Sequence, residues 1–218
     1  NNDPYKMLNI EVLNYDNDVV LNINYRARGI TTTFNGGSLS NISKVIHHHV
    51  SDSFDIKEEY NKLAKKLGLN LDHAIIFTTA ADVQRAHIVH KCKCSDINIL
   101  VSLTAGFTNP YIITAGEIHS LLHSGQSTVN IAVFVDRRLD RGATVDAVRV
   151  VSEAKAVSLF ELTGGMIHGT TSDAIAVISN TSGKEENFAG PITPVGSSIT
   201  MAVFKALSEA MKLKNIFP

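Results

Sequence analysis

Residues 97–104 read INILVSLT, and residues 128–136 read TVNIAVFVD. Both stretches are apolar at most positions and rich in β-branched side chains. Short continuous apolar runs of this kind are typical of strands that are buried on both faces. The two stretches therefore predict the central strands of the fold.

Both predicted strands lie in a segment, residues 97–135, whose single charged residue is Glu117. The charged fraction of the whole 218-residue chain is 19%, compared with about 25% in typical globular proteins. A membrane span is one reading of such a segment, but residues 97–116 contain amides, hydroxyls, glycine and proline. A spanning helix needs about 20 mainly apolar residues. We therefore expect two buried strands joined by a polar connection, and no membrane span.

The balance of charge excludes one large class of function. The chain carries 20 basic and 21 acidic residues, a formal net charge of −1, whereas a nucleic-acid binder needs a basic stripe to displace counterions. The two cysteines, Cys92 and Cys94, lack the second pair that a structural zinc site requires. A reducing cytoplasm is the simplest setting for such a chain. We expect a cytoplasmic protein that binds no nucleic acid.

Further strands and helices are interleaved around the two central strands. Strands are predicted at residues 8–13, 19–23, 73–79 and 174–179. Helices are predicted at residues 40–50, 56–67, 143–162 and 197–213. The first two strands are expected to form a hairpin, and the helix over 143–162, apolar nearly all round, is expected to be buried. The pattern favours a single α+β domain over residues 1–218, with a mixed sheet covered by helices; a three-layer α/β fold is the alternative.

The first candidate site is the loop over residues 168–174, which reads HGTTSDA and leads into a predicted strand. Glycine lets the backbone approach a ligand closely, while three hydroxyls and the Asp173 carboxylate supply hydrogen-bonding groups. This composition suits a ligand cradle or an amide-hydrolysing loop. A turn whose side chains bond to their own backbone has the same composition, so the residues alone leave both interpretations open.

A second candidate lies in the long helix, where Glu153 and Lys155 stand among apolar residues. Buried charges are costly unless they are paired. An ion pair between Glu153 and Arg149, four residues apart, is one explanation. Lys155 lies about 200° around the helix from Glu153, so one exposed edge does not readily hold both, and a functional role is the other explanation.

Two more candidates lie where predicted elements end. Thr104, Gly106 and Asn109 follow the central strand over 97–104, and ligands often bind at strand ends from which loops depart. The turn Asn35-Gly36-Gly37, a short way after Arg28, is either a plain turn or a backbone cradle. A plain turn also explains the residues after Thr104.

The histidines raise a metal hypothesis. His47, His48 and His49 are consecutive, so on a helix they fan out over about 200° and cannot all face one ion. His119 and His123 are four residues apart, but no H-E-x-x-H context or third ligand accompanies them. We expect no metal site, and a metal-dependent amidase acting through His119 and His123 stays as an alternative.

Taken together and in this order, these segments resemble the adenosylcobinamide amidohydrolases of corrinoid salvage. The match is carried by residues 28–37, 78–81, 104–109, 128–136, 153–155, 169–174 and 190–196. The likeness covers the chain from about residue 8 to residue 212. Differences are confined to single positions: His168 and Thr171 stand where the family loop has threonine and glycine, Pro110 follows Asn109 in place of alanine, and Ser152 replaces a threonine.

The resemblance implies hydrolysis of the amide that joins the aminopropanol arm to the corrin ring of adenosylcobinamide, giving adenosylcobyric acid. The cobalt corrinoid enters as the substrate, so no cofactor is expected. Catalytic roles are implied for Asp173, Glu153, Thr170 and Thr171. Substrate-binding roles are implied for Arg28, Asn35, Gly36, Gly37, Thr104, Gly106, Asn109, Lys155, His168, Gly169 and Ser172.

An amide is a slow electrophile, so the site must supply an activated nucleophile, stabilisation of the oxyanion and a proton for the departing amine. Asp173 or Glu153 is the hypothesised base for water, and a hydroxyl of residues 170–172 is the alternative nucleophile. Backbone N–H groups around Gly169 and the Lys155 ammonium are the hypothesised stabilisers of negative charge.

Two other classes of function stay open. One is a non-catalytic protein that binds corrinoids or other small molecules with the same loops, and the other is the metal-dependent amidase with another substrate. The expected partner is a small-molecule corrinoid, and a homo-oligomer is left open. The strand ends are expected to place Thr104, Gly106, Asn109 and Asp136 at the edge of a pocket for a substrate rich in neutral amides.

Overall fold

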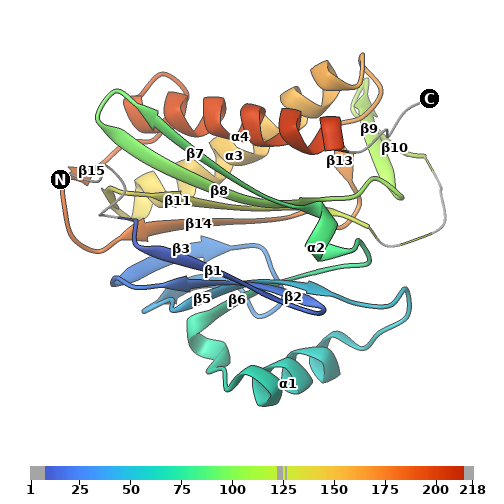
Figure 1. The fold of residues 1–218 in the computed structure, drawn as a ribbon. Coiled ribbons are helices and arrows are strands. Elements are labelled where there is room, and N and C mark those ends of the chain that lie inside the picture. The colour runs from blue at the N-terminus through green and yellow to red at the C-terminus, as the bar shows by residue number, and fades with distance from the viewer. Residues whose placement is uncertain (1–7, 122–124, 126, 214–218) are drawn as a thin grey trace.

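The computed structural model describes residues 8–121, 125 and 127–213 and arranges them in four layers (Figure 1). Two β-sheets stack face to face in the middle. Helix α1 (Ile56–Leu67) covers the outer face of the first sheet, and helices α3 (Arg141–Leu162) and α4 (Pro194–Leu213) cover the outer face of the second. The α+β class is confirmed. Two stacked sheets replace the one mixed sheet that the sequence predicts, and the three-layer alternative is wrong because there are four layers.

The first sheet has the strand order β1-β2-β5-β6. Strands β1 (Ile10–Tyr15) and β2 (Asp18–Ile23) form the predicted hairpin. Strand β5 (Lys44–His49) runs antiparallel to β2 and parallel to β6 (Ala74–Thr79), so the sheet is mixed.

Strand β5 corrects the prediction of a helix over residues 40–50. Val45 and His47 face the second sheet, while Ile46 and His48 face α1. This alternation has the period of two that defines a strand with both faces covered. The three consecutive histidines therefore point to alternate faces of the sheet.

The second sheet contains the two central strands and has the order β4-β3-β14-β11-β8-β7. Its strands are β3 (Ala27–Thr31), β4 (Gly37–Ser40), β7 (His87–Cys94), β8 (Ile97–Ala105), β11 (Val129–Val135) and β14 (Ala174–Asn180). Every residue of β8 and β11 is buried, which confirms the prediction from their continuous apolar runs. Strands β11 and β14 are parallel, and the other pairs are antiparallel.

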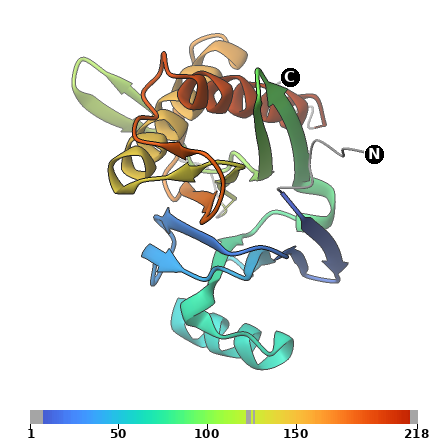
Figure 2. The same ribbon diagram turned by 90° about the vertical axis from the view of Figure 1, so that its left-hand side faces the viewer.

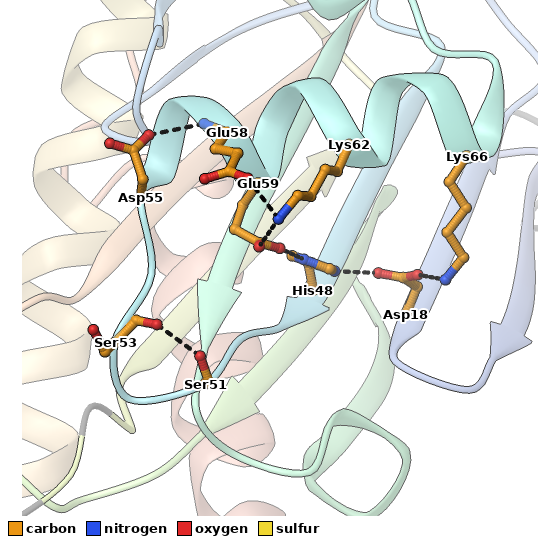
Figure 3. Close-up of polar contacts among 9 residues, drawn as sticks. All are labelled: Asp18, His48, Ser51, Ser53, Asp55, Glu58, Glu59, Lys62 and Lys66. Atoms are coloured by element: carbon orange, nitrogen blue, oxygen red, sulfur yellow. Dashed lines mark hydrogen bonds and ion pairs between the residues drawn. The ribbon is translucent and has the colours of Figure 1, made fainter.

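Helix α1 is predicted with its observed bounds, and a chain of ion pairs fixes it on the first sheet (Figure 3). His48 of β5 lies between two carboxylates, with Nδ1 2.5 Å from Asp18 of β2 and Nε2 3.0 Å from Glu59 of α1. Lys66, in the last turn of α1, donates to the other oxygen of Asp18 at 2.9 Å. Hydrogen bonds from both ring nitrogens to carboxylates require a doubly protonated imidazole, and the two carboxylates raise the pKa of His48 against the opposing effect of burial.

Helices α3 and α4 are both predicted, within three residues of their observed bounds. The expectation that α3 is buried all round is corrected. Val145, Val157 and Phe160 are 59%, 64% and 43% exposed, because the helix buries mainly its small residues and valines against the sheet and α4. No helix in the described part of the chain is long and apolar enough to cross a membrane.

Two small sheets lie at the margins. Strands β9 (Pro110–Thr114), β10 (Glu117–Ser120) and β13 (Gly169–Thr170) form one in the order β10-β9-β13, and β12 (Arg138–Leu139) pairs with β15 (Glu185–Glu186) in the other. The short helix α2 (Val83–Ala86) and a 3-10 turn (Leu71–His73) complete the elements. The pairing of β13 with β9 brings the HGTTSDA loop beside the hairpin of β9 and β10.

Candidate active site

Asp173, in the turn between β13 and β14, is the centre of the densest polar cluster around the predicted loop. Its Oδ1 accepts hydrogen bonds from the Val129 backbone N–H at 2.9 Å, from Thr128 Oγ1 at 3.2 Å and from Thr170 Oγ1. Its Oδ2 accepts from the Thr170 backbone N–H at 2.9 Å and from Lys155 Nζ at 2.5 Å. Because a carboxylate has about four acceptor positions, these five donors leave none free for a water molecule.

Lys155 reaches Asp173 from α3, and both side chains are nearly buried, at 5% and 6% exposure. A lysine buried without a counter-charge would cost several kcal/mol, so the ion pair explains how Lys155 is accommodated in a largely apolar helix. Its Nζ also lies 5.6 Å from the centre of the Tyr111 ring. Nζ donates one hydrogen bond to Asp173, and within the described part of the chain no second acceptor engages this ammonium, so its other protons can be offered to a ligand.

The three hydroxyls of the loop differ in their surroundings. Thr170 is 1% exposed, and its Oγ1 bonds to Asp173 and lies 3.1 Å from Thr128 Oγ1. Thr171 and Ser172 are exposed, and within residues 8–121, 125 and 127–213 their hydroxyls have no hydrogen bond. Thr170 is therefore the loop hydroxyl that a carboxylate orients.

Gly169 is required by close packing at this cluster. A Cβ at this position would press on Asp173 Oδ2 and lie 2.7 Å from Lys155 Nζ and 2.9 Å from the Tyr111 ring. The backbone N–H groups after Gly169 are engaged, since that of Thr170 donates to Asp173 and that of Thr171 donates to the Asn109 carbonyl at 3.0 Å. The N–H groups of Thr170 and Thr171 are therefore not free to hold an oxyanion, and Lys155 is the charged donor of the cluster.

Two cavities flank Asp173. The lysine cavity has a volume of about 380 Å³ and is lined by Tyr111, Ile113, Ile118, Lys155, Thr170, Thr171 and Asp173. The aromatic cavity, of about 270 Å³, lies at the edge between the two large sheets and includes Phe34, Phe54, Tyr60, Phe77, Asn130 and Asp173 in its lining. Only the lysine cavity contains both Lys155 and Thr170, so the reactive groups face that side.

Gly106 and Asn109 lie close to the loop, as predicted, but line neither cavity. The Gly106 N–H donates to the Thr128 carbonyl at 3.0 Å, and the Asn109 side chain donates to the Gly125 carbonyl. A Cβ at Gly106 would press on Ser127. These residues therefore support the segment that carries Thr128.

Thr104 and Asp136 do not lie at a pocket edge. Thr104 is fully buried between the two sheets, where its hydroxyl lies 3.0 Å from His47 Nδ1. Asp136 comes directly after the last residue of β11, at the end of the strand opposite to Val129. Its carboxylate accepts hydrogen bonds from Asn98 and Arg137. The expectation that these strand ends form one pocket edge is wrong, because β8 and β11 are antiparallel and their carboxyl ends lie at opposite edges of the sheet.

Arg28 and the Asn-Gly-Gly turn are also separated from the lysine cavity. Arg28 pairs in register with Ser179, near the far end of β14 from Asp173. It donates to the Leu139 carbonyl at 2.5 Å and lines a different cavity of about 360 Å³ with Arg141. The residues just before the turn, Thr32 to Phe34, line the aromatic cavity, whereas Asn35, Gly36 and Gly37 do not.

Glu153 lies on the solvent side of α3, about half exposed, and forms an ion pair with Arg149 at 2.9 Å. Arg149 also contacts Asp146 at 2.6 Å. The structural explanation of this ion pair is therefore confirmed. Glu153 lines a cavity between α3 and α4 rather than either cavity at Asp173, so the structure does not bring it to the cluster as a second carboxylate.

His168 positions the β9–β10 hairpin. Its backbone N–H donates to the Tyr111 carbonyl at 2.8 Å, and its Nδ1 accepts from the Ile113 backbone N–H at 2.9 Å. The ring stacks on Phe160 of α3 with the centroids 5.1 Å apart. The hairpin residues of the lysine cavity were missed in the sequence. The signal was the stretch YIITAGEIH, in which Ala115 and Gly116 both have positive φ, as a tight two-residue hairpin turn requires.

The histidine pair of the metal hypothesis is only partly described. His119 lies on β10, 3.8 Å from Glu117, and His123 falls outside the described residues. Among the residues that the structure describes, no group of three or more His, Cys, Asp or Glu side chains is arranged to hold a metal ion.

A buried lysine, a carboxylate and an oriented hydroxyl beside an open cavity are the equipment of a hydrolase that acts on a carbonyl group. A family model described as adenosylcobinamide amidohydrolase matches residues 4–217. A curated protein of Halobacterium salinarum with the same description is 29% identical over 197 residues, which cover 87% of this chain and 82% of that protein. The chain belongs to the adenosylcobinamide amidohydrolase family, as the motif resemblance implies, and is an amidohydrolase of corrinoid salvage.

Among solved structures, the PH0078 protein of Pyrococcus horikoshii OT3 is similar with a TM-score of 0.47 and 9% identity. The alignment covers 89% of this chain and 77% of that one. A likeness this remote does not bear on the reaction.

Proposed function

We propose that the cluster of Lys155, Asp173 and Thr170 hydrolyses the amide between the aminopropanol arm and the corrin ring of adenosylcobinamide. The products are adenosylcobyric acid and aminopropanol. The observation that supports this assignment is the buried Lys155–Asp173 ion pair, with the Thr170 hydroxyl bonded to the same carboxylate, beside the lysine cavity.

Lys155 is the proposed stabiliser of the oxyanion. Its ammonium is held by Asp173 and shielded from bulk water, so its charge acts strongly on a carbonyl oxygen in the cavity. The backbone N–H groups of Thr170 and Thr171 already have acceptors. Lys155 therefore replaces the backbone donors that the loop composition suggests.

Thr170 Oγ1 is the proposed nucleophile. Its hydroxyl already donates a hydrogen bond to Asp173 Oδ1, whereas both oxygens of Asp173 are too fully occupied to activate a free water molecule. On attack, Thr170 forms an ester with the corrin side chain, its proton passes to Asp173, and Asp173 returns that proton to the departing amine. Water then cleaves the ester, which restores the Thr170 hydroxyl and releases adenosylcobyric acid.

The experiment that tests this assignment is incubation with adenosylcobinamide and mass analysis for adenosylcobyric acid. We expect Lys155→Ala to lower kcat by about 10²–10³-fold, the effect of removing one oxyanion donor, and Asp173→Asn to abolish turnover while the corrinoid still binds. Asp146→Asn, on the exposed side of α3, is the matched control. Full activity in Lys155→Ala or Asp173→Asn would remove that residue from the mechanism, and binding of intact substrate without turnover by the native protein would favour the non-catalytic class.

The nucleophile has its own test. We expect Thr170→Ser to keep activity and Thr170→Ala to lose it, and rapid acid quenching of the native enzyme to trap a corrinoid ester on Thr170. Turnover by Thr170→Ala at the native rate would assign the attack to water.

The reaction is proposed to need no cofactor, because Lys155 supplies the positive charge that polarises the carbonyl. Activity that survives treatment with a chelator supports this, and loss of activity that is restored by a metal ion would favour the metal-dependent class. The two free cysteines support a reducing, cytoplasmic setting. The exposed apolar side chains of α3 support a homo-oligomer, which light scattering of the purified protein tests.

A further inference from the structure

The lysine cavity holds only part of a corrinoid. Its volume of about 380 Å³ is at the lower end of the range for small-molecule sites, about 300–1,000 Å³, and the corrin macrocycle with its side chains is a large ligand. When the scissile amide is beside Lys155, most of the ring must lie outside the cavity. The surface next to the cavity then decides how the ring is held.

The β9–β10 hairpin presents one uncharged face at this place. Ile113 pairs in register with Ile118, and Tyr111 pairs with Ser120, so these four side chains share a face. Ile113 and Ile118 are 47% and 72% exposed and line the lysine cavity. The carboxylate of Glu117 and the imidazole of His119 belong to the opposite face.

The hairpin is held in a fixed position relative to Lys155. Strand β9 pairs with β13, which carries Thr170, and His168 ties the backbone of Ile113 to the ring of Phe160 on α3. Figure 2 shows the hairpin, in light green, projecting from the body of the molecule beside α3. The exposed face is therefore continuous with the reactive groups and is presented by an anchored element.

We propose that the apolar face of the β9–β10 hairpin, formed by Tyr111, Ile113 and Ile118, binds the corrin ring of the substrate. The occupant is a macrocycle whose periphery carries apolar groups and neutral amides, which explains why this face is apolar and without charge. The proposal rests on the function proposed above, since it places the amide at Lys155. The hairpin determines specificity, and the cluster carries the chemistry.

The test compares Ile118→Ser and the double variant Ile113→Ser/Ile118→Ser with the control Ile192→Ser, which removes an isoleucine that is 98% exposed and outside the site. Because the ring would cover only part of each exposed isoleucine, loss of either side chain is expected to weaken binding about tenfold. We expect KM for adenosylcobinamide to rise by about this factor in the single variant, with kcat within twofold and no change in the control.

Equilibrium dialysis with adenosylcobyric acid gives a second measurement that needs no turnover. We expect the dissociation constant of this product to rise with KM in the serine variants and to recover in Ile118→Leu, which restores the apolar surface. Unchanged KM and unchanged product affinity in the double variant would overturn the hairpin proposal.

Failure of this proposal is distinguishable from failure of the proposed function. If the amide is cleaved with native kinetics by the hairpin variants but not by Lys155→Ala, the ring binds elsewhere and the catalytic assignment stands. If Lys155→Ala retains turnover while the serine variants lose affinity for the corrinoid, the hairpin stands and the catalytic assignment falls.

Discussion

Gly169 shows at the scale of one residue how closely the reactive cluster is packed. Its missing side chain leaves the space in which Lys155 Nζ and Asp173 Oδ2 meet, with the Tyr111 ring on the outer side. A glycine in this loop was predicted to bring backbone close to a ligand, whereas the structure uses it to bring two charged side chains together. Gly169 therefore allows the ion pair between Lys155 and Asp173 to form.

Gly169→Ala is expected to separate the ion pair. The added methyl must displace either the ammonium or the carboxylate, and a buried charge without its partner is strongly unfavourable. We expect kcat to fall at least as far as in Lys155→Ala, by about 10²–10³-fold. Steady-state kinetics checks this.

Gly142→Ala is the matched control, because a methyl at that position meets nothing closer than 3.6 Å. Native kinetics in Gly169→Ala would show that the ion pair tolerates displacement and would contradict the role given to Lys155.

At the scale of the element, the start of α4 explains the motif over residues 190–196. Thr193 Oγ1 donates to the Gly190 carbonyl at 2.8 Å and accepts from the Gly196 N–H at 3.0 Å. A Cβ on Gly196 would collide with the backbone carbonyls of Gly190 and Ala189. The motif thus packs the loop against the first turn of a buried helix. It lines neither of the two cavities at Asp173.

Gly196→Ala is therefore expected to lower stability without a specific effect on the reaction. Forcing a methyl into this contact costs about 1–3 kcal/mol, more than alanine gains over glycine as a helix former. Chemical denaturation should show a lower free energy of unfolding, while kcat of the folded fraction stays native. Equal stability of variant and native protein would show that the loop moves away from α4 at little cost.

The elements differ in how far the sequence predicts them. Strands β8 and β11 and helix α1 were predicted because their patterns are clear: two mainly apolar, β-branched runs, and an amphipathic helix ended by Gly68. Residues 40–50 were misread because three histidines conceal the alternation of β5. Likewise, the hairpin of β9 and β10 was missed because its exposed face has the same apolar residues as a buried one.

At the scale of the whole molecule, the imidazole of His48 joins one outer layer to its sheet (Figure 3). The pKa of His48 is raised in the folded protein by Asp18 and Glu59, so the folded state binds a proton that the unfolded chain releases near pH 6.5. This contribution to stability is complete below about pH 6.5 and is lost as the pH rises through the raised pKa.

We therefore expect the free energy of unfolding to decline on the alkaline side of neutrality, by at most about 1.4 kcal/mol per pH unit for one proton. His48→Gln should remove this decline and lower stability at pH 6. Denaturation curves collected from pH 6 to pH 9 measure the slope, and His73→Gln, at a half-buried histidine, is the control. An unchanged slope in His48→Gln would assign the decline to other groups.

The buried histidines between the two sheets predict a loss of stability on the acidic side of neutrality. His47 and His87 share the Ser102 hydroxyl, and burial lowers the pKa of His47 well below its ordinary value and that of His87 to about 4. Their contribution to stability is present above pH 6.5 and is lost as the pH falls toward 4. Denaturation between pH 7 and pH 4 should show a loss that His87→Gln reduces; a loss of the same size in that variant would contradict the assignment.

The candidate site was predictable in its chemistry and only partly in its geometry. The HGTTSDA loop and Lys155 were identified from residue types, and the structure brings them together. Thr104 was included because it ends a buried strand, Glu153 because it is a charge in an apolar helix, and Arg28 because its neighbours match a family motif. The space between the sheets, helix phase and sheet register carry these three residues away from the lysine cavity. Those three properties depend on how the elements pack together in three dimensions, which a single sequence does not reveal.

The five hydrogen bonds that Asp173 accepts also hold separate segments of the chain together. They come from the start of β11, from the β13 turn and from α3, three segments that are separate in sequence and joined at one side chain. A substitution at Asp173 therefore loosens the architecture where the chemistry occurs, and rigidity and reactivity cannot be varied independently at this position. Substitutions meant to direct this enzyme to another amide are better placed on the β9–β10 hairpin, where they leave the hydrogen bonds of Asp173 in place.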